Sequence, residues 1–195
     1  MHISDGILPV SGCLAAQAVA LGASAWAGRR VEPEEIVRMG MVASAVFVAS
    51  MVHFPVGGTS VHLGLFGLAG ILLGRRVFPV VFAALLFQAL LFQHGGLLTL
   101  GVNALNMGLG ALAAAVIWKF EAMPSSARTF LAGFAGTFLP ALLMAAEFEL
   151  AGYGKGFRFI AVLYLAVALI EGAVTAFIVA FLRRVKPGVL VRAVA

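Results

Sequence analysis

The chain has one cysteine and few charged residues, and both shortages narrow what it can be. A single cysteine, Cys13, excludes an intramolecular disulfide framework and a metal site made of several cysteines. We expect Cys13 to be a small apolar residue of the first helix. Charged residues make up 11% of the 195 residues, whereas a soluble domain averages about 25%. Hydrophobic residues reach 63%, so the composition indicates an all-α integral membrane protein.

Signatures of ATP hydrolysis and of covalent catalysis are also missing. The sequence contains no GxxxxGK followed by Ser or Thr, so any ATP hydrolysis has to come from another polypeptide. No nucleophile with a base and an orienting acid is recognisable, and we therefore expect a transport subunit rather than an enzyme. The seven methionines are scattered, which argues against a copper(I) pathway.

Apolar segments of membrane length predict seven transmembrane helices in a single membrane domain over 1–195. The third segment has about 15 residues, so as a helix of about 22 Å it is too short to cross about 30 Å of hydrocarbon. Non-helical backbone should therefore complete that crossing. Residues 1–7 are predicted as a metal-binding segment and 183–195 as a cytoplasmic tail. The helices are expected at about 8–28, 36–52, 60–74, 77–93, 98–118, 126–146 and 159–182.

The basic residues predict the orientation, because cytoplasmic loops collect Lys and Arg. Only Lys155 and Arg158 fall in the loop before the last helix, on the opposite side. The amino terminus is therefore expected outside and the carboxyl terminus in the cytoplasm, and the net charge of +5 reflects topology rather than nucleic-acid binding. The remaining basic residues share the cytoplasmic side: Arg29, Arg30, Arg38, Arg75, Arg76, Lys119, Arg128, Arg183, Arg184, Lys186 and Arg192.

All four histidines, namely His2, His53, His62 and His94, map to the outer side in this topology. Four independent residues would share one given side about one time in sixteen by chance, so the clustering is suggestive. It points to a metal ion taken up from outside.

The first two residues form a chelating group if the amino terminus is free. The Met1 amine, the His2 amide and the His2 imidazole Nδ1 close a five-membered and a six-membered ring on one metal ion. Ni(II) and Cu(II) favour a square of such nitrogens, whereas Zn(II) prefers a tetrahedron and Mg(II) or Ca(II) prefer oxygen. In most proteins a histidine at this position is a solvated tail residue. No basic leader precedes the apolar stretch, so we expect a native, free amino terminus.

The stretch HFPVGGTSVHLG offers a fourth ligand. Its Pro and Gly residues mark irregular backbone, which is tolerated at membrane depth only where it packs against protein or lines a cavity. We expect Thr59 or Ser60 to cap the third helix, which would place His62 in its first turn as the fourth ligand. His53 is either a member of the site's supporting shell or an ordinary loop residue.

Four segments in order, MHISDGILP, GGTSVHLG, FQHGGLLTLGVNALNMG and ALIEGAVTA, resemble the NikM/CbiM family of substrate-binding (S) components of energy-coupling-factor (ECF) transporters. The resemblance implies a seven-helix subunit of the cell membrane that binds Ni(II) or Co(II) as substrate at its outer face. It would work with a transmembrane coupling (T) subunit, cytoplasmic ATPases and a small accessory membrane subunit. The loop GGTSVHL looks more like the nickel members. The family's histidine-proline pair before IEG is missing from VLYLAVALIEG.

Residue by residue, the resemblance gives the same ligands: Met1, His2 and His62. His94 and Asn103 look like neighbouring loop residues of the family and are assigned to a supporting shell. Asp5 could orient the His2 ring or cap a turn.

Glu171, in the middle of the last predicted helix, is expected to be a buried anchor, either protonated, paired with Asn103, Asn106 or Gln88, or facing the coupling partner. The alternative function is a stand-alone secondary permease, which would need more such buried acids. A seven-helix signalling protein is less consistent, because the last helix has no lysine for a retinal linkage. Small residues along the first helix, from Ala16 to Ala27, allow close packing inside the chain or contact with the coupling subunit.

Overall fold

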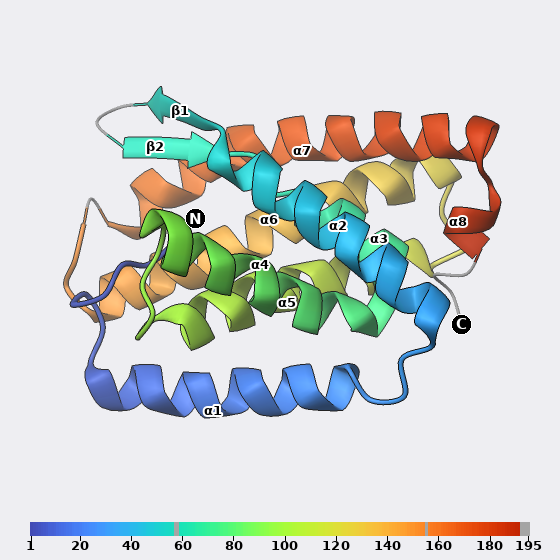
Figure 1. Cartoon of the computed structure of the whole chain (residues 1–195). Helices are drawn as coiled ribbons and strands as arrows, with labels where there is room; N and C mark the ends of the chain where they lie inside the picture. The colour runs from blue at the N-terminus through green and yellow to red at the C-terminus, as the bar shows by residue number, and fades with distance from the viewer. Residues whose placement is uncertain (57–58, 155, 192–195) are drawn as a thin grey trace.

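The computed structural model describes residues 1–56, 59–154 and 156–191, and its helices form one roughly parallel bundle (Figure 1). Gly57, Gly58, Lys155 and Arg192, which entered the sequence predictions, lie outside the described residues. Seven helices are found in the predicted order, and five segments among them are long apolar spans. The seven helices are α1 (Val10–Ala27), α2 (Pro33–Met51), α3 (Phe66–Leu73), α4 (Val77–Phe92), α5 (Leu100–Trp118), α6 (Ser125–Leu150) and α7 (Phe157–Val185), with a 3-10 turn η1 (Gly74–Arg76) and a short α8 (Gly188–Val191) at the end.

Five segments are long and apolar enough to cross a membrane: 10–27, 66–92, 100–118, 125–150 and 157–185. The segment 66–92 is not one straight helix, because Gly74 with φ 54° and ψ −132° ends α3. From there α4 runs back in the opposite direction (Figure 1). The last span extends to Val185, so the tail begins three residues later than the predicted residue 183.

The predicted start of the third helix is wrong. Residues 59–62 form strand β2 (Thr59–His62), which pairs antiparallel with β1 (His53–Val56), and α3 begins only at Phe66. Thr59 and Ser60 therefore lie in a strand and do not cap α3, and His62 is not in its first turn. Short segments rich in β-branched residues can pair as strands, and a local capping signal does not reveal such a partner. The prediction that non-helical backbone complements the short helix is confirmed.

Helix α5 lies at the centre of the bundle, and glycines bring neighbouring helices close to it. A Cβ at Gly101 would lie 2.3 Å from Gln17 Cα on α1, and a Cβ at Gly70 would lie 2.0 Å from the carbonyl oxygen of Ala111. Close backbone approach of this kind is typical of packing between membrane helices.

Helix α1 packs on the bundle along one narrow stripe. Cys13, Ala20 and Ala27 are its buried residues, and Cys13 is a free, buried cysteine as expected. The small residues of α1 thus serve internal packing, while large apolar residues such as Leu14 and Trp26 are exposed.

The two ends of the bundle differ in chemistry. The amino terminus and the β-hairpin lie at one end, and the α1–α2 connection and the end of α7 lie at the other (Figure 1). At this second end, the buried Arg76 donates hydrogen bonds to the carbonyl oxygens of Ala27, Arg29 and Arg30 and pairs with Glu35 at 3.1 Å. The histidines therefore gather at one end, and a fixed arginine network occupies the other.

Candidate metal site

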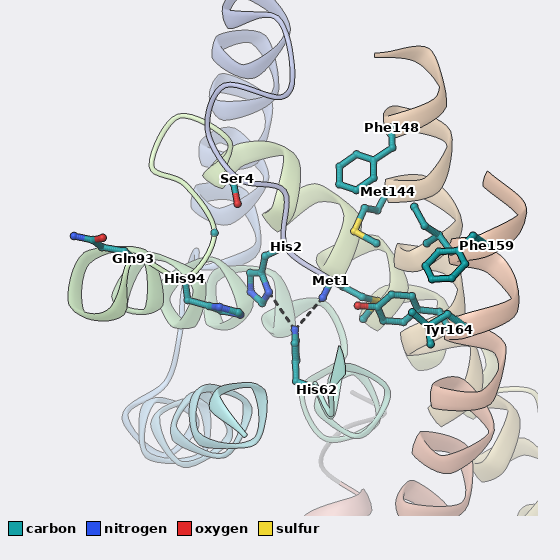
Figure 2. Close-up of a pocket in the computed structure, with 13 residues that line it drawn as sticks. Met1, His2, Ser4, His62, Gln93, His94, Met144, Phe148, Phe159 and Tyr164 are labelled. Carbon is teal, nitrogen blue, oxygen red and sulfur yellow. Dashed lines mark hydrogen bonds between the residues drawn. The ribbon is translucent and has the colours of Figure 1, made fainter. Parts of the chain in front are cut away.

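The first two residues fold back into the bundle and meet His62 of β2. The Met1 side chain is buried, and the amine nitrogen lies 2.9 Å from His62 Nε2. His2 Nδ1 lies 3.2 Å from the same His62 nitrogen. Figure 2 shows the amine and the His2 ring both directed at the edge of the His62 ring. Two nitrogens of the amino terminus thus lie beside one nitrogen of a residue 60 positions later in the chain.

Outward hydrogen bonds fix which ring nitrogens are free. His2 Nε2 lies 3.1 Å from Gln88 Oε1, and His62 Nδ1 lies 3.3 Å from the Leu63 carbonyl oxygen. Because both partners are acceptors, these ring nitrogens carry the protons and donate. The lone pairs of His2 Nδ1 and His62 Nε2 are then directed at each other with no proton between them. A cation that accepts both lone pairs satisfies this arrangement.

Burial keeps these nitrogens uncharged. It lowers the pKa of the Met1 amine from 8.0 to about 5. Burial lowers the pKa of the His2 and His62 imidazoles well below the usual value, and the charge of the nearby amine lowers them further. At neutral pH the amine and both rings are therefore uncharged, which is the form that binds a metal.

The 2.9 Å contact between the Met1 amine and His62 Nε2 is close to the distance between adjacent corners of a square, and the 3.2 Å contact between His2 Nδ1 and His62 Nε2 is longer than such an edge. With metal–nitrogen distances of about 2.0 Å, adjacent corners are about 2.8 Å apart. In the chelate formed by residues 1 and 2 the amide lies between the amine and Nδ1, so a fourth ligand is adjacent to both, as His62 Nε2 is here. Within the described part of the chain the His2 N–H has no hydrogen-bond acceptor, whereas the next amide, of Ile3, is bonded to Asn103 Oδ1 at 2.8 Å. The arrangement can present four nitrogens in one plane.

His94 lies close enough to His2 and His62 to be a metal ligand itself. One ligand atom each from His2, His62 and His94 lies within 4.8 Å of the others, and the His2 and His94 ring centroids are 4.0 Å apart. Burial, followed by the charges of His53 and the amine, lowers the pKa of His94 to about 4. His53 is opposite His62 in the β1–β2 ladder and has its Nε2 3.4 Å from His94 Nε2.

Asn103 and Asp5 hold the amino-terminal segment in place. Asn103 bonds both the N–H and the carbonyl oxygen of Ile3, at 2.8 and 2.9 Å. Asp5 does not contact the His2 ring; it accepts the Thr99 N–H at 2.9 Å and caps the start of α5. Burial acts to raise the pKa of Asp5, but the hydrogen bonds from Thr99 and Leu98 outweigh it and lower that pKa. Asp5 thus fixes the amino-terminal segment to the residues just before α5, and it caps neither its own turn nor α1.

Gln88 of α4 is a site residue that the sequence reasoning missed in this role. Its amide oxygen accepts the His2 Nε2 proton, and its amide nitrogen bonds Ser50 Oγ and the Phe47 carbonyl oxygen on α2. It is fully buried, so its orientation is fixed from both sides. The sequence feature that could have revealed this role is a single amide side chain in an otherwise apolar helix.

Replacing Gln88 with Ala should weaken nickel binding by about 10–100-fold, the usual cost of losing the partner that orients a ligand histidine. The His2 ring would lose the acceptor that selects its tautomer. Calorimetric titration with nickel measures the effect, and Gln93→Ala is the matched control, because the Gln93 side chain points away from the histidines (Figure 2). Equal affinities for Gln88→Ala and the native chain would contradict this role.

Glu171 of α7 caps helix α3 from outside it. Its Oε1 accepts the N–H groups of Gly64 and Leu65, the latter at 3.1 Å. The predicted pairing of Glu171 with one of three amide side chains is wrong. Asn103 hydrogen-bonds Ile3, Gln88 hydrogen-bonds His2, and Asn106 hydrogen-bonds Glu147. Glu171 is completely buried, and it fixes the chain two residues after His62.

A cavity of about 290 Å³ adjoins the converging nitrogens. Met1, His2, His62 and His94 line one side, and the described residues that line it include no carboxylate. On the other side Met144, Phe148 and Phe159 of α6 and α7 form an apolar wall, and the hydroxyl group of Tyr164 on α7 points toward Met1 (Figure 2).

Comparison with known proteins agrees with this picture. A family model described as "Cobalt uptake substrate-specific transmembrane region" (CbiM) matches residues 2–189. A relative from Haemophilus influenzae is 40% identical over 127 residues, which are 65% of this chain and 62% of that protein. The "Cobalt transport protein CbiM" of Sorangium cellulosum is 35% identical, over 98% of this chain and 95% of its own length. The "Fused nickel transport protein NikMN" of Rhodobacter capsulatus is 34% identical, over 76% of this chain and 47% of that protein.

The matches thus span less than two thirds of the Haemophilus and Rhodobacter proteins. A solved structure described as a transition metal transporter has the same fold, with a TM-score of 0.85 at 24% identity over 95% of this chain and 93% of the other. Since the family model covers nearly the whole sequence, the chain belongs to the CbiM family of transmembrane components for cobalt and nickel uptake, which are multi-pass membrane transport proteins and not enzymes.

Proposed function

We propose that the chain is the substrate-specificity subunit of an ATP-driven ECF-type importer and captures Ni(II) or Co(II) at the outer membrane face. The observation that carries this is the convergence of the Met1 amine, His2 Nδ1 and His62 Nε2 at 2.9 and 3.2 Å. The His2 amide, once it loses its proton to the ion, supplies the fourth nitrogen. A plane of four nitrogens with one ionised amide suits Ni(II) better than Zn(II), Mg(II) or Ca(II), and we propose nickel as the preferred substrate.

The distribution of charge supports an outward-facing site. The histidines lie at the end of the bundle opposite the α1–α2 connection, which carries Arg29 and Arg30 (Figure 1). Arg183 and Arg184 end α7 at that same far end. Since Lys and Arg collect on the cytoplasmic side, the metal nitrogens would face outward.

Energy and coupling would come from partners. The sequence has no phosphate-binding loop, so cytoplasmic ATPase subunits would hydrolyse ATP and a transmembrane coupling subunit would transmit the change. The Rhodobacter relative is described as a fused nickel transport protein, which supports the proposal that a chain of this family works together with further transport components. A small accessory membrane subunit would complete the assembly.

A stand-alone permease is the second candidate, and one observation favours it. Glu171 Oε2 has no hydrogen-bond partner within the described residues, and a second acid, Glu147, is partly buried on α6. Buried acids of this kind can carry protons in secondary transporters.

Reconstitution in vesicles separates the two candidates. Nickel uptake is expected only when the coupling subunit, the ATPases and ATP are all present. Uptake by the chain alone, driven by a proton or sodium gradient, would overturn the ECF assignment and support the permease.

A further inference from the structure

A second pair of imidazoles lies beside the converging nitrogens and has no role in the proposed square. His53 Nε2 and His94 Nε2 are 3.4 Å apart. Two ligands of a tetrahedral ion with metal–nitrogen distances of about 2.05 Å are about 3.3 Å apart. The spacing of the pair therefore fits two corners of a tetrahedron.

The fold positions His53 for this purpose. Its ring Nδ1 lies 2.9 Å from the Met51 carbonyl oxygen, so Nδ1 donates and the Nε2 lone pair is directed at His94. The antiparallel register makes His53 the cross-strand neighbour of His62, and the two ring centroids are 5.3 Å apart. Both His53 and His94 are partly exposed, whereas His62 is buried.

His94 belongs to both sets of nitrogens. Its Nε2 lies 3.4 Å from His53 Nε2. One of its ring nitrogens also lies within 4.8 Å of a ring nitrogen of His2 and of His62. An ion held by His53 and His94 could exchange ligands one at a time without returning to bulk water.

We propose that His53 and His94 form a second, weaker site that takes a divalent nickel or cobalt ion first and transfers it to the four-nitrogen site. In the transfer the bonds from the ion to His53 and His94 break, bonds to the Met1 amine, His2 Nδ1 and His62 Nε2 form, and the His2 amide binds as its proton leaves to water. The oxidation state of the ion does not change. Such a first site speeds loading of the four-nitrogen site. Loss of the His2 amide proton is slow, and an ion held nearby keeps the local metal concentration high until that proton has left. The transfer step rests on the proposed function, whereas binding at the imidazole pair does not.

Two measurements test this. In stopped-flow mixing of the purified full chain with nickel, His53→Gln should slow both loading and release at least fivefold, because it removes a step on the path in each direction. Val56→Gln, on the opposite face of the same strand and exposed, is the control and should change neither rate. Unchanged rates in His53→Gln, or faster release, would overturn the transfer step.

The second measurement uses a chain with three residues, none of them histidine, fused before Met1, which removes the amine corner of the proposed square. This chain is titrated with Co(II) and followed by its visible absorption. One weak equivalent with the strong absorption of tetrahedral cobalt is expected, and His53→Gln in the same background should remove it. No cobalt binding by the blocked chain would overturn the second site. If the unblocked chain shows no tight site while the blocked chain shows the weak one, the proposed function fails and the second site stands.

Discussion

A chain with three extra residues before Met1, none of them histidine, is expected to lose tight nickel binding while it keeps its fold. The extension turns the Met1 amine into an amide and places the new terminal amine too far along the chain to share a chelate with the His2 ring, so the amine corner of the proposed square is lost. The loss of affinity should reach about a thousandfold or more, because removing even an outer partner of a ligand costs about 10–100-fold. Nickel titration by calorimetry measures the affinity, and thermal unfolding in detergent reports the fold.

The matched control carries the same three extra residues at the carboxyl end. It should bind nickel as the native chain does. Tight binding by a fully blocked amino terminus would show that the amine is not a ligand, and the proposed coordination would then be wrong.

Replacing Glu171 with Leu is expected to destabilise the protein strongly and to weaken the metal site. The N–H groups of Gly64 and Leu65 would lose their acceptor, and each buried unsatisfied donor costs about 1–3 kcal/mol. Because His62 lies two residues before Gly64, nickel affinity should fall as well. Glu171→Gln keeps an amide oxygen as acceptor and should retain most of the stability and the affinity. Thermal unfolding and nickel titration of both variants measure these effects.

Comparing Glu171→Gln with Glu171→Leu separates a structural role of Glu171 from a role in proton transfer. Glu149→Leu is a suitable control, because this carboxylate also accepts a backbone N–H, from Phe157 at 3.0 Å, but at an exposed helix start. Glu149→Leu should lower the free energy of unfolding far less than Glu171→Leu does. If Glu171→Gln abolished transport in vesicles while it preserved stability and metal binding, the charge itself would be needed, and the permease would become the better account.

The parts of the site that are local in sequence could be predicted. Residues 1 and 2 are adjacent, so the proposed chelate follows from chemistry alone, and the proposal for His62 followed from a histidine in an irregular segment. The seven helices followed from apolar lengths, and the need for non-helical backbone followed from the shortness of the third segment.

The parts that depend on tertiary contacts could not be predicted. Gln88 orients His2 because α4 packs against α2 at Ser50, which no local pattern reveals. The carboxylate that caps α3 comes from Glu171, 107 positions after Gly64, so Thr59 and Ser60 looked like the nearest caps. In each case the competing partner lies far away in sequence.

The absorption spectrum of the nickel-loaded native chain tests the central claim most directly. Four nitrogens in a plane, one of them an ionised amide, predict a yellow, diamagnetic, square-planar nickel centre formed with one equivalent of metal. A paramagnetic centre with the weak bands of octahedral nickel would contradict the coordination by Met1, His2 and His62.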